Sequence, residues 1–236
     1  RSWAYLMGAI QQLMSSFGPT GPTGPTDPFW TSVTSLTHME GANGGITFID
    51  QKPISWTLTP SSVTSTAQFK FGSASMLVSG GMINSTTALS ASGFGTGDFT
   101  IEGWFYATAT TTRGLFDARL ISSPATIAAG WDQANTRWQI YFNGTIYNSS
   151  ATSITLNTWQ HFALVRNGTS CVFYVGGVSI IAFSSGANVT FPQLNYGRYY
   201  NNSFPWVGYI DECRVTKGVA RYTSAFSPPT AAFPDS

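Results

Sequence analysis

The sequence predicts an all-β domain, a sandwich of two antiparallel sheets, and three observations support this fold class. Phe99, Ile101 and Phe105 follow the period of two within residues 98–106, which is typical of a strand with one buried face. More than ten short strand-like runs are separated by turns rich in Gly, Asn and Ser. Two pairs of these runs are joined by Asn-Gly, which favours a hairpin turn of type I′. Such a pattern indicates a two-sheet jelly roll.

Residues 98–106 are expected to be a central strand, and the other runs are expected to supply its neighbours. The first hairpin joins residues 138–142 to 145–147 through Asn143-Gly144, and the second joins 159–166 to 171–175 through Asn167-Gly168. In chain order, we expect strands at residues 33–39, 46–50, 56–58, 75–78, 98–106, 114–119, 138–142, 145–147, 159–166, 171–175, 178–183, 194–197 and 206–215.

The composition excludes two classes of function. The 236 residues carry a formal net charge of +1, and only 9% are charged, so the basic face that nucleic-acid binding needs is missing. No apolar run approaches the ~20 residues that span a bilayer. Apolar residues make up 42% of the chain, enough for one packed domain. The two cysteines, Cys171 and Cys213, lie in strand-like runs and are expected to be buried thiols rather than a disulfide.

Residues 1–17 are predicted to form an amphipathic helix. Its apolar residues are spaced alternately three and four apart, which makes a heptad seam. Such a helix is marginal alone and must bury its stripe, either on its own domain or in oligomerisation or docking. The seam consists of Trp3, Leu6, Ile10, Leu13 and Phe17.

Residues 18–28 contain three Gly-Pro-Thr triplets, the repeat of a collagen-like triple helix. Three triplets are too few to hold a triple helix unaided, so the alternative is a stiff polyproline spacer. We favour a short stalk that belongs to a homotrimer, because the triplets directly follow a heptad helix. Residues 29–236 then form the jelly-roll domain.

Several motifs resemble the laminin-G-like, concanavalin A-like jelly roll, in the form common in bacteriophage structural proteins. Examples are Gly-Asp-Phe-Thr-Ile-Glu-Gly-Trp at 97–104 and Asn-Thr-Trp-Gln-His-Phe-Ala-Leu-Val-Arg at 157–166. The resemblance implies a virion surface protein such as a tail fibre. The family usually has Asp where Glu40 stands and an aliphatic residue where Cys213 stands. The matching runs are residues 36–44, 48–50, 69–75, 95–104, 156–166, 208–222 and 226–230.

The resemblance also implies a calcium site, because the family's calcium sites use the loop after the first strand and the closing Ile-Asp-Glu strand. The alternative is that Asp211 accepts backbone N–H groups and that Asn43-Gly44 is only a turn. The positions that match a calcium site are Glu40, Gly41, Asn43, Asp50 and Asp211.

Catalysis is not expected. Glycoside hydrolysis needs two carboxylates about 5–10 Å apart, and Glu102 is the only carboxylate within residues 99–106. Asp211 and Glu212 are adjacent, so they point to opposite faces. His38 and His161 lie in strand-like runs and are expected to be structural.

Sugar binding requires aromatic side chains with converging amide and hydroxyl groups, and two stretches have this composition, residues 131–133 and 198–206. The alternative is that Phe204 and Trp206 fill the edge of the sandwich. The candidate carbohydrate-binding residues are Trp131, Asp132, Tyr199, Tyr200, Asn201 and Trp206.

We therefore expect a non-enzymatic virion structural protein, most simply a phage tail fibre or surface appendage that binds host-surface glycans. Its N-terminal helix is expected to dock on other virion proteins. The alternatives are a capsid decoration, cement or head-fibre protein, and a bacterial adhesin at the cell surface. Neither nucleic acid nor a membrane is an expected partner.

Overall fold

The computed structural model describes residues 26–58, 61–85, 93–119, 127–190, 193–199 and 203–236. The predicted helix at 1–17, with Trp3, Leu6, Ile10, Leu13 and Phe17, lies outside the described residues, as do residues 18–25 of the Gly-Pro-Thr run.

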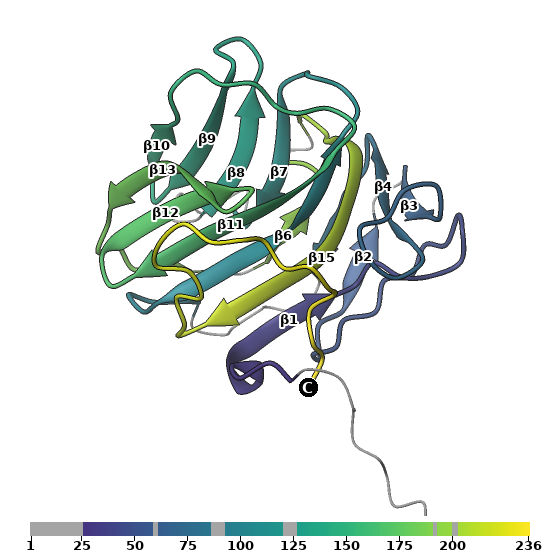
Figure 1. The fold of residues 1–236 in the computed structure, drawn as a ribbon, viewed down its shortest axis with the longest axis horizontal. Coiled ribbons are helices and arrows are strands. Elements are labelled where there is room, and N and C mark those ends of the chain that lie inside the picture. Colours follow the sequence, from purple (N-terminus) through teal and green to yellow (C-terminus); the bar gives the residue numbers. More distant parts are fainter. Residues whose placement is uncertain (1–25, 59–60, 86–92, 120–126, 191–192, 200–202) are drawn as a thin grey trace, which may run out of the picture.

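The described residues form an all-β sandwich of two antiparallel sheets (Figure 1). The larger sheet has eight strands in the order β13-β12-β11-β6-β15-β4-β3, with β1 also paired to β15. The predicted fold class is confirmed. The strands of this sheet are β1 (Val33–Thr37), β3 (Ser62–Ser65), β4 (Ser75–Ser79), β6 (Phe99–Ala107), β11 (Trp159–Asn167), β12 (Ser170–Val175), β13 (Val178–Ser184) and β15 (Val207–Lys217).

The second sheet has seven strands in the order β10-β9-β8-β7-β14-β5-β2 and lies behind the first in the view of Figure 1. Helical structure in the described residues is limited to one 3-10 turn, Trp30–Ser32. No helix in the described part of the chain is long and apolar enough to cross a bilayer. The strands of this sheet are β2 (Trp56–Leu58), β5 (Ile83–Ser85), β7 (Arg113–Asp117), β8 (Ile127–Asp132), β9 (Arg137–Phe142), β10 (Thr145–Asn148) and β14 (Asn195–Tyr196).

Strand β6 is central, as its sequence predicts, because it pairs with β11 on one side and β15 on the other. Phe99, Ile101 and Phe105 have no exposed surface and belong to the main core between the sheets. Phe105 packs against Trp138 and Trp206, with ring centroids 5.4 and 5.3 Å apart. The inner face of β6 therefore holds the two sheets together through aromatic packing.

Some local predictions were wrong. Residues 46–50 are not a strand; only an isolated bridge links Thr37 to Asp50. Strands β3, β5 and β8 were missed, because short runs such as Ser62–Ser65 and the Ala-Ala-Gly of β8 have little apolar periodicity.

Both Asn-Gly hairpins exist, but they differ in where the chain turns. In the first, Asn143 and Gly144 have φ of 47° and 87°, as a type I′ turn requires. In the second, Asn167 still pairs with Ser170, so the turn is one residue later than expected. Cys171 and Cys213 are buried free thiols, which confirms that prediction.

Residues 218–236, called here the C-terminal segment, cross the outer face of the eight-stranded sheet (Figure 1). Thr100 of β6 donates its hydroxyl to the carbonyl of Val219 at 3.0 Å, and the ring of Phe226 packs against Tyr174 of β12. The segment ends beside the start of the domain, where the N–H of Asp27 donates to the carbonyl of Ser236 at 2.7 Å.

Candidate functional site

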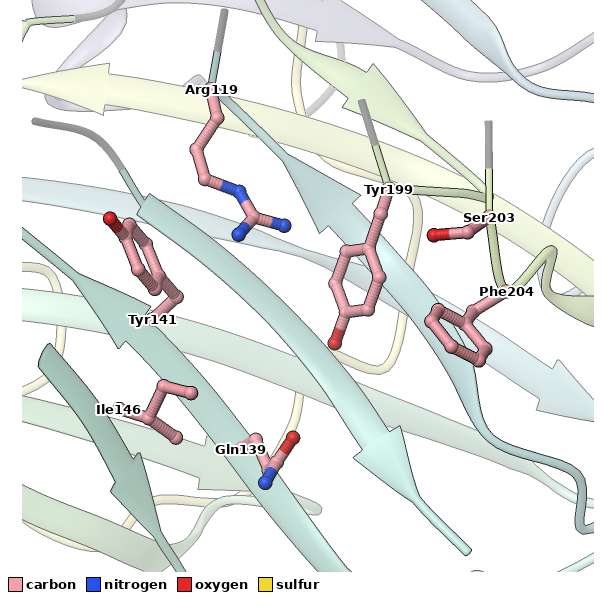
Figure 2. A pocket seen from close by; sticks show the side chains of 7 residues that line it. All are labelled: Arg119, Gln139, Tyr141, Ile146, Tyr199, Ser203 and Phe204. Atoms are coloured by element: carbon pink, nitrogen blue, oxygen red, sulfur yellow. The ribbon is translucent and has the colours of Figure 1, made fainter. Parts of the chain in front are cut away.

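A hollow of about 230 Å³ opens on the outer face of the seven-stranded sheet (Figure 2). Alternation along β9 builds one of its walls: Trp138 and Phe142 point into the core, while Gln139 and Tyr141 point outward. The residues that line this hollow, called here the outer pocket, are Arg119, Gln139, Tyr141, Ile146, Tyr199, Ser203 and Phe204.

The ring of Tyr199 lies over two strand glycines. A Cβ added at Gly130 would come 2.1 Å from the Tyr199 hydroxyl oxygen, and one added at Gly114 would come 2.8 Å from its ring. Glycine inside a strand often marks such a close approach. Burial raises the pKa of Tyr199 to about 12, so its hydroxyl stays protonated and able to donate at neutral pH. Gly114 and Gly130 thus make room for a fixed aromatic surface.

Arg119 lies between this ring and a second one. The centre of its guanidinium is 5.1 Å from the Tyr199 ring and 4.7 Å from the Tyr141 ring, within cation–π range. Asp117, which has no exposed surface, fixes the guanidinium: the Arg119 Nε lies 3.0 Å from each carboxylate oxygen, and Nη2 donates at 2.5 Å. Arg119 is therefore both oriented and neutralised by its partner.

Asp132 anchors the polar wall of the outer pocket. One of its oxygens accepts from Asn135 at 2.7 Å, from Arg137 at 3.3 Å and from Gln139 at 3.3 Å. The Asn135 hydrogen bond lowers the pKa of Asp132, which is therefore an anion at neutral pH. The Gln139 amide nitrogen also donates to Asn148 at 3.0 Å, so this network orients the amide and leaves its carbonyl oxygen to accept from a ligand hydroxyl.

The outer pocket thus combines two tyrosine rings, an amide, a serine hydroxyl and an oriented guanidinium around a small space. Ile146 and Phe204, which are 55% and 50% exposed, add apolar surface at its rim. None of the described lining residues is a carboxylate. The arrangement suits a compact ligand with many hydroxyl groups and one apolar face.

The structure corrects two of the residues proposed for carbohydrate binding. Trp131 and Trp206 are 2% and 0% exposed and lie in the core between the sheets, so neither can reach a surface ligand. Tyr199 lines the outer pocket, and Asp132 acts behind it through Gln139. Tyr200 and Asn201 lie outside the described residues.

Residues 198–206, which include Ser203 and Phe204, were expected to bind sugar, with packing of Phe204 at the sandwich edge as the alternative, but most of the pocket's lining residues were not named as candidates. One signal was present. Gln139 and Tyr141 alternate with the apolar residues of β9, which marks a polar outward face. The strand glycine Gly130 was a second sign that a side chain approaches closely. The lining residues not named as candidates are Arg119, Gln139, Tyr141, Ile146, Ser203 and Phe204.

Among the residues proposed for calcium, Glu40 and Asp211 both bind the loop before β4. Glu40 accepts from the Ser73 N–H at 2.9 Å, and Asp211 accepts from the Lys70 N–H at 2.7 Å. Burial raises the pKa of Asp211 to about 8, although the N–H donors of Lys70 and Phe71 oppose the shift. Both carboxylates thus act on backbone amides, the alternative that the sequence left open.

The other calcium candidates have separate partners. Asp50 accepts from Ser35 and from the Leu36 N–H at 2.6 and 3.0 Å, and Asn43 accepts from the Thr66 N–H at 3.2 Å. Gly41 is exposed. No three His, Cys, Asp or Glu side chains gather into a metal cluster in the described part of the chain. Calcium binding stays a prediction.

A second group of titratable side chains lies on the outer face of the eight-stranded sheet, beneath the C-terminal segment. Arg214 donates to Glu102 at 2.8 and 2.9 Å and to Asp27 at 3.0 Å. Arg221 donates to Asp27 at 2.6 Å, and the Tyr222 hydroxyl donates to Glu102 at 2.7 Å. These five residues are called here the buried ionic cluster.

Within the buried ionic cluster, Asp27, Glu102 and Arg214 are buried, and Arg221 and Tyr222 are half-buried. Glu102 and the neighbouring His161 have no exposed surface and lie 3.3 Å apart. Burial by itself raises the pKa of Glu102, but Arg214, His161 and Arg221 lower it to about 2. His38 pairs with Glu212 at 2.8 Å, on the same sheet. The ion pairs and hydrogen bonds among these groups join the C-terminal segment to the sheet, which is a structural role.

Comparison with known families supports the fold. The model of the laminin-G-like family described as the concanavalin A-like lectin/glucanases superfamily matches residues 79–221, more than half of the chain. A comparison with curated proteins gives no match.

Solved structures share the fold at low sequence identity. Domain 4 of AbnA, a GH43 extracellular arabinanase from Geobacillus stearothermophilus, in complex with arabinotriose, superposes with a TM-score of 0.59 at 16% identity, over 80% of this chain and 94% of that domain. The binding domain of botulinum neurotoxin DC in complex with SialylT gives 0.57 at 10% identity, over 80% of this chain. Trypanosoma rangeli sialidase gives 0.55 at 12% identity, over 91% of this chain. The chain spans 49% of that toxin domain and 37% of that sialidase.

Proposed function

The chain belongs to the concanavalin A-like lectin/glucanases superfamily, and from this premise we propose that it is a carbohydrate-binding protein whose sugar site is the outer pocket. The observation that carries the proposal is the fixed position of Arg119 between the rings of Tyr141 and Tyr199. Aromatic rings can cover the apolar face of a sugar, while the Gln139 amide and the Ser203 hydroxyl can bind its hydroxyl groups.

Two similar structures support a sugar ligand. The arabinanase domain is described in complex with arabinotriose, and the neurotoxin binding domain in complex with SialylT. At 16% and 10% identity these structures share only the fold with this chain. The proposal of a sugar ligand therefore depends on the residues of the outer pocket.

We propose binding without catalysis. Glycoside hydrolysis needs two carboxylates about 5–10 Å apart on either side of the scissile bond. The described lining residues of the outer pocket include no carboxylate, and the nearby Asp117 is buried and paired with Arg119. Glu102 lies under the C-terminal segment, on the other sheet, where a polysaccharide cannot reach it.

In its wider role, we propose a virion surface protein, such as a phage tail fibre, that binds host-surface glycans. The support is the heptad seam and the Gly-Pro-Thr triplets of residues 1–28, which are typical of a trimeric stalk joined to other virion proteins. A capsid decoration, cement or head-fibre protein and a bacterial adhesin are the alternatives. A monomeric mass for the full chain at micromolar concentration would contradict the trimer.

A glycan array probed with the full 236-residue chain tests the sugar site. We expect binding to at least one host-surface polysaccharide and a loss of about tenfold or more in affinity for Tyr199→Ala and for Arg119→Ala. Tyr209→Ala is the matched control, since Tyr209 is a half-buried tyrosine on the outer face of the other sheet. A silent array, or equal affinity in Tyr199→Ala, would overturn the proposal.

A further inference from the structure

The outer pocket carries no net charge, and this property bears on which sugars it can hold. We infer that the outer pocket is selective for uncharged sugars over sugars that carry a carboxylate or a sulfate. The inference rests on the proposed function and goes beyond it, because a sugar site on this fold could in principle use an arginine to bind an acidic glycan.

Arg119 is the only cation among the described lining residues, and Asp117 cancels its charge. The two groups form a bidentate pair in which the Asp117 side chain has no exposed surface and that of Arg119 is 17% exposed. An anionic ligand would have to compete with a carboxylate that is already desolvated and in place. It would also lie close to that carboxylate, and like charges at short range repel.

A second ion pair balances the opposite wall. Asp132 lies behind Gln139 and is paired with Arg137 at 3.3 Å. Exposure of the side chains is 13% for Asp132 and 31% for Arg137, so the carboxylate is the more deeply buried of the two. The chain segments 120–126 and 200–202, which follow Arg119 and Tyr199, contain no charged residue. The two ion pairs, Asp117 with Arg119 and Asp132 with Arg137, thus contribute two positive and two negative groups to the pocket and the side chains behind it.

The remaining groups are those that a neutral sugar needs. The Ser203 and tyrosine hydroxyls can both donate and accept hydrogen bonds, and the Gln139 carbonyl oxygen can accept, because its amide nitrogen already donates to Asp132 and Asn148. An accepting carbonyl suits a ligand hydroxyl and repels a carboxylate, which only accepts. The volume of about 230 Å³ is below the ~300–1,000 Å³ of pockets that hold drug-sized ligands. One neutral sugar ring is the unit that fits these limits.

Matched sugar pairs test the inference. The full chain is titrated with oligosaccharides of galactose and galacturonic acid, of glucose and glucuronic acid, and of mannose and mannuronic acid, which differ in one group at C6. We expect the neutral member of each bound pair to bind about tenfold more tightly, and its affinity to be insensitive to salt. Equal or tighter binding of the acidic members would overturn the selectivity and leave the sugar site standing. Failure of every pair together with a silent glycan array would overturn both.

Variants that change the charge of the outer pocket provide a second test of its selectivity for uncharged sugars. Asp117→Asn leaves Arg119 without its counter-charge, so the preference for the neutral member should fall about tenfold. Gln139→Lys adds a positive charge on the opposite, half-exposed wall and should also lower the preference for the neutral sugar. It tests the inference even if Asp117→Asn does not fold. Lys217→Gln, a change of one charge at the far end of β15, is the control. An unchanged preference in a folded charge-shifted variant would contradict the inference.

Discussion

The two outer faces of the sandwich carry similar residue types and use them differently. On the eight-stranded sheet, Glu102 accepts hydrogen bonds from Arg214 of β15 and from Tyr222 of the C-terminal segment that covers it. On the seven-stranded sheet, Arg119 and Tyr199 line the outer pocket (Figure 2), and the buried Asp117 pairs with Arg119. The difference teaches that the same residue types join a covering segment to the sheet on one face and leave an arginine and a tyrosine accessible on the other, where we propose that they bind a sugar.

Breaking the buried ionic cluster should have the largest effect. Arg214→Met leaves Glu102 buried without its main partner and removes one of the two arginines that hold Asp27, which should lower the free energy of unfolding by about 3–5 kcal/mol. The matched control is Arg137→Met at the open face, where a partly exposed pair should cost less than about 1 kcal/mol. Urea unfolding measures both, and equal losses would contradict the contrast between the two faces.

The second-largest effect should be a loss of folding stability at acid pH, caused by protonation of Glu102 on the covered face. Because the pKa of Glu102 is lowered to about 2 from its ordinary 4.5, its contribution to stability is complete above pH 4.5 and is lost as the pH falls toward 2. The loss should be about 3 kcal/mol. Melting temperatures of the wild type and of Glu102→Gln across this range measure it; an identical acid slope in the variant would exclude Glu102 as the source.

Removing one hydroxyl from each face gives the smallest and most specific effects. Tyr222→Phe removes the donor to Glu102, so it should cost about 1.5–3 kcal/mol of stability and leave sugar binding unchanged. Tyr199→Phe should change stability by less than about 1 kcal/mol, and it should weaken sugar binding. Denaturant unfolding measures the stability of both variants, and glycan titration measures their affinity for the sugar. A loss of stability in Tyr199→Phe together with a loss of sugar affinity in Tyr222→Phe would contradict the two roles.

The sandwich could be predicted because its signal is local. Phe99, Ile101 and Phe105 reveal a buried strand face through their spacing alone, and Asn143-Gly144 specifies a turn through its own backbone preferences. The order of strands in each sheet has no such local signal, since β6 and β15 are far apart in the sequence.

The site was harder to predict because its composition misleads. Trp131 and Trp206 have the residue type of a sugar site but point into the core. The outer pocket instead depends on strand register, which brings Tyr141 of β9 close to Arg119 and Tyr199. Only the assembled sheet reveals that proximity.

The ion pairs of Asp27 have a mechanical consequence. A pull arriving from the residues before Asp27 meets a carboxylate that is held by Arg214 of β15 and by Arg221 of the C-terminal segment. The load therefore enters the middle of the eight-stranded sheet, through β15, before it can peel β1 from that sheet's edge. The start of the described domain is thus joined by ion pairs to the eight-stranded sheet, while the outer pocket lies on the seven-stranded sheet.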